Sequence, residues 1–257
     1  MLSYQHAYHA GNPADLHKHA ALAALLALLT RKPRPVSYLE SHAGRGLYDL
    51  DSAEARKTGE AAAGIGRAAP AGPYAAALAA VRAAHGPRAY PGSPAIARAL
   101  LRPQDRLTLC ELHPAEHAAL GRALGGAGVA IHRRDGHEGL LALTPPKPRR
   151  GLALIDPSYE VKEEYAQAAE TFLGVVARWP EGVAALWYPV LPAGRHRAML
   201  ARLRAALPGL TVAEMRLLAP PARGMQGAGL ALAGTPHGTA AALAEAWAPF
   251  AGIFGPA

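Results

Sequence analysis

Short apolar runs alternate with longer segments of helical spacing through most of the chain. The apolar runs predict strands at residues 36–40, 107–111, 129–132, 151–155, 183–188, 210–218 and 229–233. Between the later strands, apolar residues recurring every three or four positions predict helices at residues 114–124, 161–179 and 196–207. This alternation predicts an α/β fold built on a doubly wound, mostly parallel sheet of seven strands.

The first 50 residues contribute one helix and the first strand. Asn12 and Pro13 are typical of a helix start, and leucines at helical spacing follow them. Two prolines end this helix before the strand at 36–40. The turn after that strand, residues 43–46, holds two glycines, which allow a backbone to approach a ligand closely.

Residues 51–89 interrupt the alternation. They are rich in Ala and Gly and predict one helix, at 73–85, but no convincing strand. The simplest interpretation is a helical subdomain inserted into a larger domain, which residues 1–50 and 90–257 form. A Ser-Pro pair at 93–94 then predicts the cap and first turn of the next helix.

Acidic residues fall at or directly after four of the predicted strands. They are Glu40, Glu111, Asp135 and Asp156. The carboxyl ends of parallel strands meet at one edge of a sheet, and ligands bind there in open α/β folds. We therefore expect these four acids to mark a binding crevice.

The segment Asp156-Pro157-Ser158-Tyr159 directly follows one apolar strand and suits chemistry on an exocyclic amine of a base. The lone pair of such an amine is delocalised into the ring. Acceptors that bind both amine hydrogens make it more available, and the Asp156 carboxylate and Pro157 carbonyl are candidates. Tyr159 can stack on a flipped-out base. The alternative interpretation is a proline turn with a core tyrosine.

Composition limits the classes of protein that fit. The 257 residues suffice for one α/β domain with an insertion, and 51% are hydrophobic, which excludes a disordered chain. The single cysteine, Cys110, excludes an internal disulfide and suits a reducing compartment. The longest apolar run, 20–29, is about half of the ~20 residues that span a bilayer. We expect a soluble, cytoplasmic protein.

The chain is basic, with 27 Lys and Arg against 19 Asp and Glu and a formal charge of +8. Basic proteins often bind polyanions, because their cations displace counterions from phosphates. The alternative is a compositional bias that also makes the chain rich in alanine. If the charge serves nucleic-acid binding, we expect the basic excess around the mouth of the crevice, the amino-terminal segment and the insertion.

The motifs that carry a family resemblance run nearly end to end. They are Met1–Asn12, Asp15 with Lys18 and His19, His42–Gly44 with Gly46, Thr58–Glu60, Tyr90–Pro94, Glu111–Pro114, Asp135–Gly136, Asp156 and Pro157 with Tyr159, Trp187–Val190 and Arg223–Met225. In these motifs the chain resembles the RlmJ-type 23S ribosomal RNA adenine-N6 methyltransferases, class I enzymes that use S-adenosylmethionine. The resemblance implies a Rossmann-like class I methyltransferase fold with a helical insertion, and methylation of the N6 amine of one adenine, adenine 2030.

The resemblance also implies roles for single residues. Those at the cofactor are Lys18, His19, His42 and Ser93 near its methionine end, Gly44 in the turn, Glu111 at the ribose, and Asp135 with Gly136 at the adenine. The catalytic set is Asp156, Pro157 and Tyr159, with Asp156 also beside the cofactor, and Tyr4 and Tyr159 contact the RNA. The implied partner is 23S ribosomal RNA, protein-free or in an early assembly intermediate. We expect a monomer without a metal ion.

One residue departs from the family pattern Asp-Pro-Pro-Tyr. Ser158 replaces the second proline, whose fixed φ stiffens the turn. Both acceptors and the ring are retained, so we expect the same reaction. Two alternatives stay open: adenine-N6 methylation of DNA, and a nucleic-acid-binding module with catalysis weakened by Ser158. A histidine cluster at residues 6–19 also permits a metal site, although no cysteine or carboxylate spacing supports one.

Overall fold

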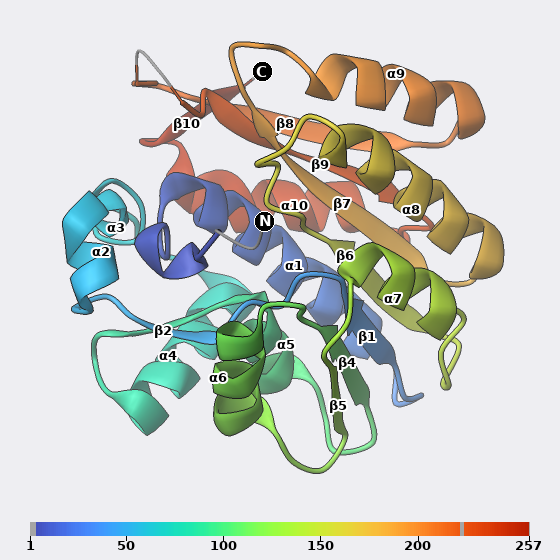
Figure 1. Ribbon diagram of the computed structural model, residues 1–257, viewed down its shortest axis with the longest axis horizontal. Coiled ribbons are helices and arrows are strands. Elements are labelled where there is room, and N and C mark those ends of the chain that lie inside the picture. The colour runs from blue at the N-terminus through green and yellow to red at the C-terminus, as the bar shows by residue number, and fades with distance from the viewer. Residues whose placement is uncertain (1–3, 222–223, 257) are drawn as a thin grey trace.

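Eight strands form the main sheet of the computed structural model (Figure 1), which describes residues 4–221 and 224–256. Their order is β10 (Phe254–Pro256), β8 (Thr211–Leu217), β9 (Gly227–Ala233), β7 (Val183–Val190), β6 (Gly151–Ile155), β1 (Ser37–Glu40), β4 (Arg106–Cys110) and β5 (Val129–His132). The strands from β7 to β5 are parallel, and β9 is antiparallel to β7 and β8. Met1–Ser3 and Arg223, which belong to the resemblance motifs, lie outside the described residues.

The predicted doubly wound, mostly parallel α/β sheet is confirmed, with one strand more than the seven expected. The additional strand, β10, pairs antiparallel with β8. Its three residues are too few to show a periodic pattern. Burial of Phe254 against the main core holds it in place.

Helices cover both faces of this sheet (Figure 1). One layer contains α1 (Pro13–Thr30), α4 (Gly72–His85), α5 (Ser93–Leu100) and α10 (Thr239–Trp247), and the other contains α7 (Gly136–Leu143), α8 (Glu164–Arg178) and α9 (His196–Ala206). Strand side chains alternate between the layers, so that Tyr38 packs in the first core and Leu39 in the second. The remaining elements are α6 (Pro114–Leu124) between β4 and β5, and short helices η1 (His6–Tyr8) and η2 (Ala248–Phe250). No helix within the described residues is long and apolar enough to cross a membrane.

The segment predicted as an insertion lies between two short strands of its own. These strands, β2 (Leu47–Asp49) and β3 (Ala89–Pro91), pair antiparallel and enclose α2 (Ala53–Thr58), α3 (Glu60–Ala63) and α4. The buried residues of α4, Tyr74 among them, belong to the main core. The division into an inserted subdomain at 51–89 and a surrounding domain stays a prediction.

The two helix starts predicted from capping residues differ in outcome. At α1 the prediction is confirmed, because the Asn12 side chain accepts a hydrogen bond from the Asp15 N–H and Pro13 is the first helical residue. At α5 it is wrong: Gly92 is the N-cap and Ser93 already lies in the helix. The Ser93 hydroxyl donates instead to the buried carboxylate of Glu40, the last residue of β1.

Candidate active site

A cavity of about 620 Å³ lies at the carboxyl ends of β1, β4 and β6. Its lining includes every residue that the sequence singled out for cofactor, catalysis or RNA: Tyr4, Lys18, His19, His42, Gly44, Ser93, Glu111, Asp135, Gly136, Asp156, Pro157 and Tyr159. A cavity of this size is typical of a small-molecule or cofactor site. The fold therefore brings these residues together, while their individual roles stay predictions.

Lys18 and Asp156 form the central ion pair of the cavity. Lys18 Nζ lies 2.7 Å from Asp156 Oδ2 and 3.4 Å from Asp15 Oδ1. Burial alone would lower the pKa of Lys18, but the two carboxylates outweigh it and raise that pKa, so the ammonium stays charged. Lys18 also lies over the Trp187 ring, 5.6 Å from its centre. The candidate catalytic carboxylate is thus already oriented by a buried cation.

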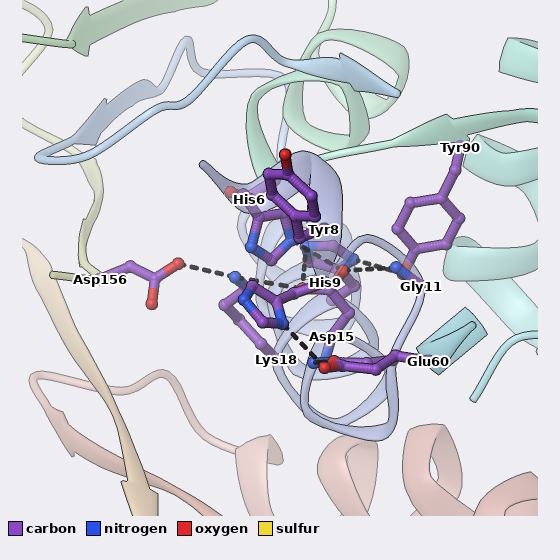
Figure 2. Close-up of polar contacts among 12 residues, drawn as sticks. His6, Tyr8, His9, Gly11, Asp15, Lys18, Glu60, Tyr90 and Asp156 are labelled. Atoms are coloured by element: carbon purple, nitrogen blue, oxygen red, sulfur yellow. Dashed lines mark hydrogen bonds and ion pairs between the residues drawn. The ribbon is translucent and has the colours of Figure 1, made fainter. Parts of the chain in front are cut away.

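A polar network joins this pair to the amino-terminal segment (Figure 2). Asp15, fully buried, accepts hydrogen bonds from the Gly11 N–H at 2.8 Å and from His6 Nε2 at 3.0 Å. The other ring nitrogen of His6 lies 2.9 Å from the Tyr4 hydroxyl. Burial would raise the pKa of Asp15, but the Lys18 ammonium and the hydrogen bond from His6 hold that pKa well below its usual range. Tyr4 is thereby linked through His6 and Asp15 to Lys18.

The turn between β1 and β2 forms another wall of the cavity. The Gly44 N–H donates to Glu111 Oε2 at 2.8 Å, and the His113 N–H donates to the other oxygen at 2.7 Å. Gly44 has a φ of +59°, and a Cβ there would lie 2.5 Å from the Tyr48 hydroxyl oxygen. A Cβ on Gly136 would lie 2.0 Å from the Ser41 carbonyl oxygen. Both glycines are required for this backbone arrangement.

The two cofactor-site histidines, His19 and His42, are neutral. Burial lowers the pKa of each to about 3. His19 is completely enclosed, with Nδ1 3.0 Å from the Tyr90 hydroxyl. His42 Nδ1 lies 2.7 Å from Ser41 Oγ, which also accepts the Asp156 N–H at 3.1 Å. Each ring therefore offers hydrogen bonds and packing to the cavity, but no charge.

Glu40 is the one strand-end acid that does not line the crevice. The expectation for this residue is wrong: it is fully buried and takes no part in the cavity lining. Burial raises its pKa to about 8, although hydrogen bonds from Ser93 and Tyr38 lower it. The carboxyl group points into the layer of packed side chains, where Ser93 connects it to the cavity.

The loop after β6 is tethered on both sides. The Tyr159 hydroxyl donates to the Trp187 carbonyl at 2.6 Å, and the Tyr159 backbone has a φ of +57°, the single positive value of a non-glycine residue in the described part of the chain. The Ser158 hydroxyl lies 3.2 and 3.3 Å from the two carboxylate oxygens of Glu164 in the first turn of α8. These contacts fix the loop that carries Asp156 and Pro157.

The lining of the cavity is acidic, as the strand-end acids lead us to expect. Eight acidic residues are in its described lining, Asp15, Glu60, Glu111, Glu116, Asp135, Asp156, Glu160 and Glu164, and Lys18 is the single Lys or Arg there. Acids at strand ends collect at this edge by topology. The expected basic excess around the mouth of the crevice, in the amino-terminal segment and on the insertion stays a prediction, because it concerns the surface around this lining.

Among the polar residues that hold the site together without a role assigned from the sequence are His6, Asp15 and Ser41. The spacing of Asp15, Lys18 and His19 on one face of α1 was an available signal, because residues three and four apart are neighbours on a helix. His6 and Ser41 are found only by their contacts with segments distant in the chain.

The histidines of the amino-terminal cluster have separate surroundings. His9 lies 2.9 Å from Glu60, and His17 stacks on Trp247 with ring centres 4.7 Å apart. Within the described residues, no group of three His, Cys, Asp or Glu side chains is arranged to hold a metal ion. Cys110 is buried, and burial raises its pKa to about 11, so it is a core residue.

Comparison with known proteins gives one consistent family. The family model described as "Ribosomal RNA large subunit methyltransferase D, RlmJ" matches residues 33–251. The Ribosomal RNA large subunit methyltransferase J of Escherichia coli (strain K12) is 40% identical over 213 residues, 80% of this chain and 76% of that protein. Its namesake from Haemophilus influenzae is 40% identical over 200 residues, 74% and 71% of the two chains. A crystal structure of a Legionella pneumophila protein superposes with a TM-score of 0.81 at 34% identity, over 94% of both chains.

Proposed function

Because this chain belongs to the RlmJ family of ribosomal RNA large subunit methyltransferases, we propose that it transfers the methyl group of S-adenosylmethionine to the N6 amine of one adenine in 23S ribosomal RNA, adenine 2030 by the family resemblance. The observation that carries the proposal is the position of Asp156. Its carboxylate lies in the cavity at the end of β6, next to Pro157 and near Tyr159. These groups match the acceptors and the aromatic face that an adenine amine requires.

The cavity suits S-adenosylmethionine in its donor set and its shape. The Glu111 carboxylate beside the Gly44 N–H is suited to ribose hydroxyls, and the missing side chains at Gly44 and Gly136 keep the wall open. The excess of acids favours a cationic ligand. When bound, the cofactor supplies a methyl group that its sulfonium charge has already activated.

Lys18 and Asp156 have different roles at the amine: Lys18 orients the carboxylate, and Asp156 accepts a hydrogen bond. Lys18 occupies Oδ2 of the carboxylate, and Figure 2 shows the other oxygen directed away from Lys18. That oxygen, Oδ1, accepts one amine hydrogen, and the Pro157 carbonyl accepts the second. Methylation makes the nitrogen cationic and acidic, so its proton leaves afterwards without a strong base. The chain supplies orientation and acceptors rather than a base.

Tyr159 holds the base out of its stack. Its hydroxyl is committed to the Trp187 carbonyl, and its ring lies 4.5 Å from the Tyr165 ring, centre to centre. Both contacts limit rotation of the Tyr159 ring, which lines the cavity where we propose that the adenine lies. Tyr4, 38% exposed at the cavity, is the proposed second contact to the RNA.

The test is methyl transfer from labelled S-adenosylmethionine to a protein-free 23S ribosomal RNA transcript, followed by mapping of the modified base. Asp156→Ala should reduce the rate by about 100-fold or more, since it removes an acceptor at the reacting nitrogen. Asp49→Asn is the control, because Asp49 is exposed and outside the cavity lining. An Asp156→Ala rate equal to that of the parent contradicts the mechanism.

Substrate class is decided by direct competition between RNA and duplex DNA, because the amine chemistry is the same for both. Preferential methylation of the transcript at one adenine supports the proposal. Preference for DNA contradicts it and favours the DNA alternative. Binding of RNA without methyl transfer at saturating cofactor favours a module that has lost catalysis.

A further inference from the structure

Basic side chains gather at the edge of the sheet opposite the cavity. They belong to the segments that lead into β1, β4 and β6, and comprise Arg31, Lys32, Arg34, Arg102, Arg106, Lys147, Arg149 and Arg150, here called the basic edge. Two acids accompany them, Asp105 and Glu181. The basic edge therefore holds a large part of the positive charge that the cavity lacks.

Topology brings these segments together. Strands β6, β1 and β4 are parallel neighbours, and Ser37 pairs with both Arg106 and Gly151, so their amino ends lie side by side (Figure 1). The Arg102 guanidinium donates to the carbonyls of Thr30, Lys32 and Arg34 at 2.7–3.1 Å. The partly exposed Arg102 side chain thus holds the loop before β1 in shape.

A second set of contacts attaches the loop before β6. The Ser37 hydroxyl donates to the Pro148 carbonyl at 2.8 Å, and the Arg150 guanidinium donates to the Leu29 carbonyl at 2.5 Å. These bonds cross between segments more than 100 positions apart in the chain. The basic edge is therefore an ordered surface built from three loops, and not a flexible run of cations.

Most of this charge lacks a counter-charge. Asp105 neutralises Arg102, and Glu181 pairs with Arg149 at 3.0 Å. Lys32, Arg34 and Lys147 are exposed, and none of them has a carboxylate within 4.0 Å among the described residues. The cations repel one another: burial, Arg34 and Arg102 together lower the pKa of Arg150. A polyanion bound here would relieve this repulsion.

We propose that the basic edge is a second RNA-binding surface, which holds a segment of the substrate RNA remote from the methylated adenine. The inference rests on the proposed function, which makes RNA the polyanion that this chain meets. The acidic cavity lining offers little attraction for phosphates, so affinity for a large RNA has to come from elsewhere. A strand of five residues such as β6 separates the two edges by roughly 17 Å, at about 3.3 Å per residue.

The experiment compares two triple variants by filter binding, each of which removes three positive charges. One is Lys32→Gln/Arg34→Gln/Lys147→Gln at the basic edge. The matched control is Arg195→Gln/Arg197→Gln/Arg204→Gln, which neutralises three exposed residues at or near α9. The probes are a 23S ribosomal RNA transcript and an oligoribonucleotide of about five nucleotides centred on the target adenine, which is too short to reach the basic edge, each over a range of salt concentrations.

The basic-edge variant should bind the transcript about tenfold or more weakly at 0.1 M salt, with the slope of log Kd against log salt reduced by about 2 to 3. Its affinity for the oligonucleotide should not change, and the control should keep the parent's affinity for both. Equal loss in the control, or equal loss for the oligonucleotide, overturns the proposal. The single variant Lys147→Glu repeats the test with one exposed side chain if the triple variant does not fold.

Methyl transfer separates this inference from the proposed function. If the parent protein methylates neither RNA, the proposed function fails whatever the binding data show. If the parent methylates both RNAs and the basic-edge variant binds the transcript with unchanged Kd, the second surface alone is refuted. If the variant loses binding to anionic phospholipid vesicles but not to RNA, the basic edge serves a membrane surface and the proposal is wrong.

Discussion

Ser158, which replaces a proline of the family pattern, allows a direct test of how the catalytic loop is held. Its hydroxyl lies within hydrogen-bond distance of both carboxylate oxygens of Glu164. Glu164 thereby ties the loop after Asp156 to the first turn of α8. We infer that this side-chain contact supplies the stiffness that a proline ring would provide.

The size of the effect follows from the geometry. The two O···O distances of 3.2 and 3.3 Å exceed the ~2.7 Å of a strong O–H···O bond, and one proton is shared between both carboxylate oxygens. Such a bond contributes about 1 kcal/mol. If all of it is lost in the transition state, Ser158→Ala lowers the rate of methyl transfer about fivefold.

The assay is single-turnover methyl transfer to the 23S transcript at saturating S-adenosylmethionine, with thermal unfolding as a check on the fold. Glu164→Ala should lose the same factor as Ser158→Ala, and the double variant should lose no more, because both remove one contact. Ser158→Pro should keep at least the parent rate. In the Ser158→Pro background, Glu164→Ala should have little effect, since the ring then holds the turn.

Two results would refute this reasoning. A parent-like rate for Ser158→Ala shows that the contact has no part in positioning Asp156. An equal loss from Glu164→Ala with and without Ser158→Pro shows that Glu164 acts by another route, such as its own charge at the cavity. Gln167→Ala, in the same helix and cavity lining, is the control for general disturbance of α8.

Three further variants test the buried charges by urea unfolding. Lys18→Met leaves Asp15 and Asp156 without their shared cation, so the free energy of unfolding should fall by about 3 kcal/mol. Adding Asp156→Asn should recover part of this loss, and no recovery contradicts the pairing. The pKa of Glu40 rises from 4.5 to about 8, so the folded protein keeps a proton that the unfolded chain releases. The free energy of unfolding should therefore fall between pH 5 and 8 by up to about 1.4 kcal/mol per pH unit. Glu40→Gln should remove this slope, and an unchanged slope refutes the assignment. Burial lowers the pKa of His17 from 6.5 to about 3, so unfolding takes up a proton and the protein loses stability as the pH drops below 6.5. The parent should be about 2 kcal/mol less stable at pH 5 than at pH 7.5 because of this residue, and His17→Phe should remove that loss. Parallel pH profiles of the parent and the variant contradict this assignment.

Strong local patterns predicted the core of the fold closely. The helix at Pro114–Leu124 and the strands at Val129–His132 and Gly151–Ile155 have the predicted bounds. Elements without a periodic pattern were not predicted, among them the β2–β3 pair and β10, because three residues are too short to show alternation. Their formation depends on partners that the fold places beside them.

The sequence by itself determined the fold class, the strand-end positions of Glu111, Asp135 and Asp156, and the chemistry expected of the loop after β6. These features are local: strand period, turn residues and the order of elements require no knowledge of distant contacts. They also placed the cavity, since the carboxyl ends of parallel strands always share one edge.

Tertiary structure alone decided how the charges are used. The pairing of Lys18 with Asp156 joins residues 138 positions apart, and the same folding removed Glu40 from the cavity. The charge of +8 identified neither a site nor a partner, because net charge carries no position. Only the parallel packing of β6, β1 and β4 gathers acids at one edge and uncompensated cations at the other.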